Sequence, residues 1–302
     1  VVYVGANDGM LHAFNAGIAI RTPENAIRPL ELNPAGYDLG SELWAYVPKN
    51  LLPHLRWLKD PEYCHVYYVD LKPYITDVQI FADDPVHPFG WGTVLIGGMR
   101  LGGTAIADET GTCRSAYFAI DITDPLDPVP LWEFTDPTLQ YTVCYSTVVK
   151  VRDSWFLVLG SGPITCGGDC AQIGKVFVLD LATGVLERTF NLPDAQSFVA
   201  DIFACDWGID YNVDRIYFGD CHWVGAPAKE WQGKVFRILT NDDPDPNVWT
   251  MDMIMDMKQP ITAEGSVATD EYNNLWVYFG SGRLYSDIDE SNPLRHTYVG
   301  FR

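Results

Sequence analysis

The chain has 302 residues, of which 47% are hydrophobic and 13% aromatic, and its formal net charge is −20. This composition excludes a disordered protein, because it supplies enough apolar side chains for a buried core. The charge argues against a nucleic-acid partner, which would require clustered Lys and Arg, and it suits either divalent cations or solubility alone.

A strand that runs into glycine recurs along the chain. Its copies are 2–5, 91–97, 155–160, 215–219 and 276–280. Their glycines are 92, 63, 59 and 61 residues apart, so the first interval indicates the same unit with an insertion of about thirty residues. Such a period is typical of a repeat architecture.

Each copy is followed by a second strand, at 11–14, 117–121, 176–180, 235–238 and 298–301. Three units add an aromatic strand that opens at Trp44, Trp132 or Trp249, and several have a strand before the glycine. Four antiparallel strands per unit predict an all-β fold, a β-propeller, because one such sheet buries both faces only when neighbours stack on it. The strand glycines then indicate close approach near the central channel. A β-sandwich with coincidental spacing is the alternative.

Pro- and Gly-rich inserts interrupt the units at 17–43, 48–65 and 100–114, and we expect surface loops there, with a short helical turn at 51–58. The sequence predicts one propeller domain over 1–302. Because the chain starts inside a strand and without Met, we expect it to be the C-terminal part of a longer precursor. It contains no signal peptide and no apolar run of membrane-spanning length.

Seven cysteines are many for a cytosolic chain of this size, which favours an oxidising compartment. Cys166 and Cys170 bracket a Gly-rich run in which a loop disulfide would fit, and Cys205 and Cys221 bracket an acidic segment. The pairing cannot be read from the sequence. No phosphate loop or nucleophile elbow occurs, so we do not expect an enzyme.

Two units differ in one hairpin. Asp270 precedes Gly280 by ten positions, whereas Asp201 precedes Gly219 by eighteen. We therefore expect eight extra residues in the second hairpin's turn. That turn carries Asp206, Asp210 and Asp214, which recur every four positions.

Carboxylates at this spacing predict a calcium site, because a compact loop can wrap them around one Ca²⁺, which takes about six to eight oxygen ligands. We expect Asp206, Asp210 and Asp214 to bind through their side chains and Asn212 through its main-chain carbonyl. The alternative is a solvated acidic turn held by a Cys205–Cys221 disulfide.

The loop matches an EF-hand-type loop only in part. Gly208 occupies the third position, where Asp or Asn is expected, and a water could replace that ligand. Tyr211 occupies the sixth position, where glycine normally makes the turn, and we expect tyrosine to resist a positive φ. Two other acidic segments, 241–247 and 287–292, are better explained as exposed turns than as metal sites. The six histidines lie on separate units without ligand spacing.

Three segments together resemble a known family: 1–15, the stretch from Asp201 to Asp220 with its Asp-Arg-Ile-Tyr-Phe-Gly-Asp ending, and 276–283 with its Gly-Ser-Gly-Arg ending. They are similar to the C-terminal domain of the PilC/PilY proteins, calcium-binding adhesins and biogenesis factors of the type IV pilus tip. The likeness runs almost from the first residue to the last.

This resemblance implies a modified seven-bladed propeller outside a bacterial cell, at the pilus tip or on the outer-membrane surface. It implies a calcium loop that opposes pilus retraction, with ligands at Asp206, Asp210, Asn212 and Asp214. The partners it implies are minor pilins or the pilus tip complex, and a host or abiotic surface. Attachment and twitching motility would be the cellular outcomes.

Two alternatives come from other classes of protein. A quinone-dependent dehydrogenase can use the same propeller, but such enzymes typically carry a bridged pair of adjacent cysteines, and this chain has no adjacent cysteines. A metal-free structural propeller that offers loops to a protein partner would differ from the first hypothesis only in its indifference to calcium.

Overall fold

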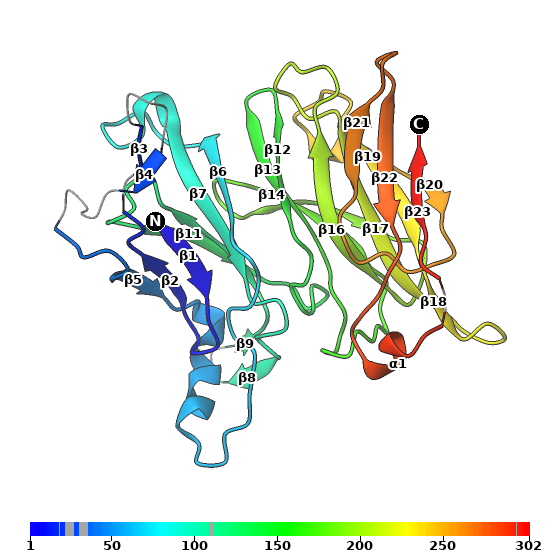
Figure 1. The fold of residues 1–302 in the computed structure, drawn as a ribbon, viewed down its shortest axis with the longest axis horizontal. Helices are drawn as coiled ribbons and strands as arrows, with labels where there is room; N and C mark the ends of the chain where they lie inside the picture. Colours follow the sequence, from blue (N-terminus) through cyan, green and yellow to red (C-terminus); the bar gives the residue numbers. More distant parts are fainter. Residues whose placement is uncertain (18, 22–26, 30–35, 109–110, 294) are drawn as a thin grey trace.

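The computed structural model describes residues 1–302 except 18, 22–26, 30–35, 109–110 and 294. These residues form five successive antiparallel sheets, which follow one another across the molecule from the N-terminus to the C-terminus (Figure 1). The predicted all-β architecture is therefore confirmed. Within the described residues, no helix is both long enough and apolar enough to cross a lipid bilayer.

The five sheets have these strands. The first contains β1 (Val2–Gly5), β2 (Leu11–Phe14) and β5 (Glu42–Tyr46); the second β6 (Tyr74–Gln79), β7 (Trp91–Gly98), β10 (Tyr117–Asp121) and β11 (Val129–Phe134). The third contains β12 (Thr147–Val151), β13 (Ser154–Gly160), β14 (Lys175–Asp180) and β15 (Leu186–Asn191). The fourth contains β16 (Ser197–Cys205), β17 (Arg215–Val224), β19 (Lys234–Leu239) and β20 (Thr250–Asp256), with β18 (Glu230–Gln232) paired to the end of β17. The fifth contains β21 (Ser266–Thr269), β22 (Leu275–Gly280) and β23 (Tyr298–Phe301).

Each predicted glycine strand is the second strand along the chain in its sheet, except that the first sheet begins with it. Its side chains alternate between the two faces. On β13, Phe156 and Val158 pack toward the fourth sheet, whereas Leu157 and Leu159 pack toward the second. Both faces of the third sheet are thus buried by neighbours, which is the reason that the repeat needs several copies to be stable.

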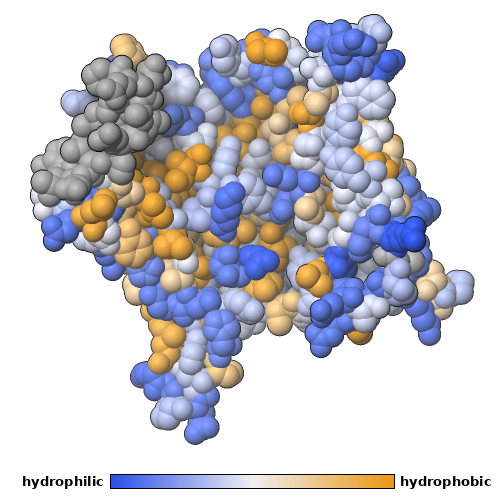
Figure 2. All heavy atoms as spheres, viewed as in Figure 1, coloured by the Kyte–Doolittle hydropathy of each residue, from blue (hydrophilic) through white to orange (hydrophobic). Residues whose placement is uncertain are grey.

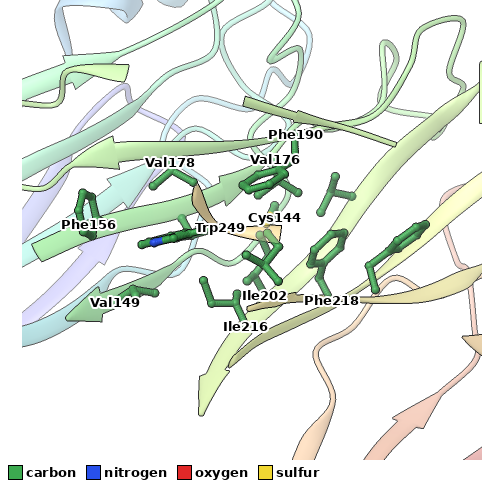
Figure 3. Close-up of a cluster of buried hydrophobic side chains, with 14 of the residues drawn as sticks. Cys144, Val149, Phe156, Val176, Val178, Phe190, Ile202, Ile216, Phe218 and Trp249 are labelled. Carbon is green, nitrogen blue, oxygen red and sulfur yellow. The ribbon is translucent and has the colours of Figure 1, made fainter. Parts of the chain in front are cut away.

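Four main hydrophobic clusters lie between successive sheets. The cluster between the third and fourth sheets centres on the buried Trp249, whose ring lies 5.3 Å from that of Phe156 in an edge contact (Figure 3). Among the residues that the structure describes, no cluster joins the first sheet to the last. The described residues therefore form an arc of five sheets. This is fewer than the seven blades that the resemblance implies.

The strand glycines allow neighbouring sheets to approach. A Cβ on Gly160 would lie 2.4 Å from the Cβ of Val199, and one on Gly219 would lie 2.3 Å from Cγ2 of Ile261. Val199 lies in the first strand of the fourth sheet, which follows the sheet of Gly160. Ile261 lies in the segment that leads into the fifth sheet, which follows the sheet of Gly219. The predicted close approach is therefore confirmed at these two glycines, where any larger residue would push the next sheet away, whereas a Cβ on Gly97 would meet Phe118 of its own sheet.

The inserts are partly structured. The segment 48–65 contains a 3₁₀-helical run, η1 (Lys49–Lys59), which confirms the short helical turn expected at 51–58. Small hairpins occur in the other two inserts, β3 (Ala19–Arg21) with β4 (Ile27–Pro29) and β8 (Ile106–Asp108) with β9 (Gly111–Cys113). The rest of these two inserts falls partly outside the described residues.

The remaining helical elements of the described residues are two short 3₁₀ turns, η2 (Pro88–Gly90) and η3 (Pro246–Val248), and one helix, α1 (Asp287–Glu290). On the face in Figure 2, hydrophobic residues gather between the two halves and on the left side, with hydrophilic residues among them and along the right side.

The suggested Cys205–Cys221 disulfide is wrong. In the β16–β17 ladder, Cys205 pairs with Arg215 and Cys221 pairs with Phe198, so the two cysteines lie at opposite ends of the hairpin. Six residues of extended strand separate these positions by about 20 Å, far beyond the reach of a disulfide. Cys166 is exposed and Cys170 is buried, and no bridge joins them.

Candidate functional site

The acidic loop connects β16 to β17 and spans residues 206–214. The corresponding turn between β21 and β22 spans 270–274. Nine residues therefore replace five, so only four of the eight extra residues enlarge the turn. The others lengthen β16, which has nine residues against four in β21 and contains a bulge between Val199 and Ile202. The expectation that all eight lie in the turn is corrected accordingly.

The backbone of the loop adopts the conformation that we expected tyrosine to resist. Tyr211 has φ 68° and Ile209 has φ 54°. Both side chains are exposed, 81% and 82% respectively, so no packing against the core compensates for the strain of the left-handed region. The sharp turn at the sixth loop position is thus made without glycine, and other interactions must hold it.

Those interactions are hydrogen bonds from the loop's own carboxylates. Asp206 accepts the backbone N–H groups of Asp210 and Tyr211, at 3.2 and 2.8 Å. Asp214 accepts those of Trp207 and Gly208, at 2.7 and 3.2 Å. Asp210 accepts the N–H of Asn212 at 2.9 Å. The three carboxylates therefore wrap the loop around themselves, and each keeps lone pairs for a further partner.

The loop also rests on the neighbouring sheet, at the β12–β13 turn. The N–H of Val213 donates to the carbonyl of Lys150 at 2.8 Å, and the Asn212 Oδ1 accepts the N–H of Arg152 at 2.7 Å. The main-chain carbonyl of Asn212, the expected calcium ligand, accepts no hydrogen bond from the described residues. It is therefore available to a cation.

The carboxylates of the loop do not converge on one point at which a calcium ion could bind. Among the described residues, one group of three acidic, His or Cys side chains has ligand atoms all within 4.8 Å of one another, and it does not include Asp206, Asp210 or Asp214. These carboxylates would have to turn inward to share one ion. A Cβ on Gly208 would lie 3.8 Å from Asp210 Oδ2 and 4.0 Å from Asp206 Oδ1, so the third loop position does face two of the expected ligands. The donor set is chemically suitable for Ca²⁺, but it is not drawn together around a point.

The sequence did not predict the group whose ligand atoms lie within 4.8 Å of one another. It consists of Asp194, Asp220 and His222. His222 Nδ1 lies 3.1 Å from Asp220 Oδ2 and 3.9 Å from Asp194 Oδ2, and burial raises the pKa of the Asp220 carboxyl. The spacing of Asp220 and His222 on one strand puts both on the same face and could have indicated the pair. The ammonium of Lys234, 2.6 Å from Asp194 Oδ2, already supplies a cation there.

A second feature that the sequence did not predict lies between several sheets. A cavity of about 860 Å³ is lined by residues from several units, among them Asp70, Arg100, Tyr145, Asp201 and Glu264. Burial raises the pKa of Asp201 to about 6, although one of its oxygens accepts the N–H of Tyr145 at 2.6 Å. Asp201 belongs to the bulge of β16, so the bulge directs a carboxylate into this cavity.

The two weaker acidic segments are local structures. In 241–247, Asp245 caps η3 by accepting the N–H of Asn247 at 2.9 Å. In 287–292, Asp289 forms a capping box in α1 with Ser286 and pairs with Arg283. Both segments use their carboxylates for hydrogen bonds that shape the chain, as expected for turns.

Comparisons with known proteins bear on the resemblance. The chain is 28% identical to a type IV pilus biogenesis factor PilY1 homolog of Xylella fastidiosa over 99% of its own length and 19% of the relative's. It is 30% identical to the type IV pilus biogenesis factor PilY1 of Pseudomonas aeruginosa strain UCBPP-PA14, over 82% of the chain and 18% of the relative. The chain thus spans about a fifth of the length of these curated relatives. No family model matches it.

A solved structure supports the fold. The chain superimposes on the crystal structure of the Pseudomonas aeruginosa PilY1 C-terminal domain with a TM-score of 0.65 and 23% identity, which covers 99% of this chain and 56% of that one. The likeness confirms a β-propeller-like fold. The resemblance seen in the sequence is therefore confirmed: the chain is a homologue of the type IV pilus biogenesis factor PilY1 and matches its C-terminal domain.

Proposed function

We propose that this chain is a calcium-binding module of a type IV pilus tip protein, and that it takes part in pilus biogenesis, in control of extension and retraction, and in attachment to surfaces. The observation that carries the proposal is the match to PilY1 relatives over 99% of the chain, together with the acidic β16–β17 loop. The relatives are named as biogenesis factors, which favours a binding and assembly role over catalysis. The whole chain would form one propeller domain, and its working place would be the pilus tip or the bacterial outer surface.

The calcium part of the proposal rests on the loop's own groups. Asp206, Asp210 and Asp214 each have unused lone pairs, and the Asn212 carbonyl accepts no hydrogen bond from the part of the chain that the structure describes. The positive φ of Tyr211 makes the turn that keeps these groups within one compact loop. Bound calcium would draw the carboxylates together and tighten the contact with the β12–β13 turn. A change in calcium would then change the order of a loop that bridges two blades.

Calorimetry tests the metal site directly. The chain should release or absorb heat when Ca²⁺ is added, and Asp210→Ala should weaken the affinity at least tenfold. Asp210 is the suitable position because it is exposed and, among the described residues, its carboxylate accepts a hydrogen bond from Asn212 alone. Asp243→Ala, in the exposed 241–247 turn, is the matched control and should leave the affinity unchanged. Equal calcium affinity in the wild type and in Asp210→Ala would remove the metal from the proposal.

The pilus role needs a separate test in cells. A strain that carries the full-length protein with Asp210→Ala should still assemble pili but show altered twitching motility, since calcium occupancy would no longer influence retraction. A strain that lacks the protein should have fewer surface pili. Normal piliation and motility in both strains would contradict the pilus role, whatever calorimetry shows. The tip partners, minor pilins or the tip complex, could be identified by crosslinking on intact pili.

A further inference from the structure

A cavity of about 690 Å³ lies at the far end of β17 from the acidic loop. It is formed where the β17–β18 hairpin, the segment around Pro260, the glycine-rich 167–170 loop and α1 meet. Figure 1 places β18 and α1 at the lower edge of the molecule, whereas β16 points toward the upper edge. β17 has ten residues, and its nine residue-to-residue steps separate the cavity from the loop by about 30 Å.

Two tryptophans form the aromatic wall. Trp223 and Trp231 are directly opposite each other in the β17–β18 ladder, with ring centroids 5.3 Å apart and an interplanar angle of 63°. Neither indole N–H donates a hydrogen bond to any described residue. Of the ten tryptophans of the chain, Trp44, Trp132, Trp249 and Trp276 donate to groups within it. The cavity therefore offers aromatic surface and indole donors that the protein itself does not use.

Arg283 makes this wall rigid. Its guanidinium lies 4.3 Å from the Trp231 ring centroid, pairs with Asp289, and donates to the carbonyls of Gly167 and Gly168 at 3.1 and 3.0 Å. The residue is 8% exposed, and its Nε is buried without a hydrogen-bond partner. Arg283 covers one face of Trp231, so Trp223 is the ring better placed to meet a ligand. The Arg283 charge is neutralised by Asp289.

Uncommitted polar side chains surround the aromatic wall. The amide of Gln196 is exposed and makes no hydrogen bond within the described chain. Glu230 uses Oε1 to accept from Gln232 at 2.7 Å, which leaves Oε2 available. Apart from the Arg283–Asp289 pair, the charged lining groups are Asp169, Glu230 and Lys229. The lining is thus slightly acidic, on a chain of net charge −20, and repels anionic ligands.

We propose that this cavity binds a neutral saccharide. A sugar ring presents an apolar C–H face that can lie on an indole and adjacent hydroxyls that can pair with an amide or a carboxylate, and both partners are free here. The volume is that of an ordinary small-ligand pocket. A phosphorylated or sulfated ligand would meet the acidic lining without a free guanidinium, which argues against it. Trp223 would carry the ring contact, and Gln196 and Glu230 would bind hydroxyls.

The site is independent of the calcium loop and stands on its own geometry. Where the attachment role proposed above holds, this cavity supplies a ligand class for it. The tests are separable, since saccharide binding is measured on the isolated chain and requires neither pili nor calcium.

The test is a printed array of neutral and anionic oligosaccharides probed with the 302-residue chain, followed by calorimetry with the sugars that it retains. We expect retention of neutral sugars, at least tenfold weaker binding by Trp223→Ala, and several-fold weaker binding by Gln196→Ala. Gln196 is exposed and contributes no side-chain hydrogen bond to the fold, so this variant tests the site even if Trp223→Ala unfolds. Trp91→Ala is the matched control, because Trp91 is 43% exposed on β7, away from the cavity.

The outcomes are distinguishable. Binding that falls in Trp223→Ala and Gln196→Ala but not in Trp91→Ala, and that persists in chelator, supports the proposal. Retention of anionic sugars alone would overturn it, as would binding that Gln196→Ala and Trp223→Ala leave unchanged. Retention of no sugar at millimolar concentration would also overturn it. Peptides selected from a random library that bind in place of sugars, and are lost in Trp223→Ala, would reassign the cavity to a peptide ligand.

Discussion

In the hairpin β21–β22 the five-residue turn 270–274 closes on Asp270, which accepts hydrogen bonds from Tyr272, Asn274 and Trp276. In the hairpin β16–β17 the aligned Asp201 lies in a bulge well before the turn and lines the cavity of about 860 Å³. One position in the repeat thus holds a turn-making carboxylate in one sheet and a half-buried, cavity-lining one in another. The extra residues of β16–β17 are divided between strand and turn. The carboxylates of the longer turn therefore bind only within their own loop, whereas Asp201 lines the cavity.

The largest effect is expected from making the two hairpins alike. Replacing 206–214 with Asp-Glu-Tyr-Asn-Asn, the sequence of 270–274, should abolish calcium binding at this loop because it removes Asp206, Asp210 and Asp214 together. The fold should persist, but the melting temperature should fall by a few degrees since the contacts to Lys150 and Arg152 are lost. Calorimetry and thermal unfolding with and without chelator check this. Retention of the wild-type calcium heat would contradict the loop as the metal site.

The next effect concerns Asp201. Its folded pKa of about 6 lies above the usual value of about 3.9, so the folded chain holds a proton that the unfolded chain releases. The wild type should lose stability as the pH rises from about 4 to about 6. Asp201→Asn removes this penalty and should be more stable by about 2 kcal/mol at pH 7, with the difference vanishing near pH 4. Asparagine keeps an oxygen for the N–H of Tyr145.

Denaturant unfolding at several pH values measures this difference, and Asp270→Asn is the matched control with the opposite sign. Hydrogen bonds from Trp276 and Asn274 lower the pKa of Asp270, so its contribution is present above the unfolded value and is lost in acid. Asp270→Asn should therefore destabilise the chain at neutral pH. Equal stability of Asp201→Asn and the wild type at pH 7 would show that Asp201 is better solvated than its burial indicates.

A smaller effect is expected at the third position of the loop. Gly208 does not have a positive φ, and a side chain there would face Asp206 and Asp210. Gly208→Asp should add a carboxylate to the ligand set and strengthen calcium binding by about tenfold, which calorimetry would detect. Gly208→Asn controls for charge and should strengthen binding less. Weaker binding in Gly208→Asp would show that repulsion among the carboxylates outweighs the added ligand.

The smallest effect is expected at the sixth position. Tyr211 is 81% exposed and has a positive φ, so Tyr211→Gly relieves strain of about 1 kcal/mol without loss of packing. Thermal unfolding should show the corresponding rise in melting temperature, whereas calcium affinity should stay unchanged because the strain is already present before an ion binds. Tyr211→Ala, which keeps a Cβ, should not show this gain. If Tyr211→Gly weakens binding, the phenol contributes something to the loop that the structure does not show.

The strand repeat was readable from the sequence because alternating apolar side chains and terminal glycines have a regular spacing that stacking sheets require. The enlarged hairpin was also readable, from the unequal distances between Asp201 and Gly219 and between Asp270 and Gly280. The division of its extra residues was not. The position of a bulge depends on which side chains the neighbouring sheets bury, and this cannot be predicted from the number of residues in a hairpin.

The sequence by itself determined that the chain builds stacked β-sheets, that one turn is rich in carboxylates, and that three motifs match the PilC/PilY proteins, because each of these is a local pattern. Only the tertiary structure decided that Cys205 and Cys221 lie at opposite ends of a hairpin, that Tyr211 accepts a positive φ, and that Trp223, Trp231 and Arg283 meet at one cavity. These results depend on register and on contacts between distant segments, which form only when the sheets stack.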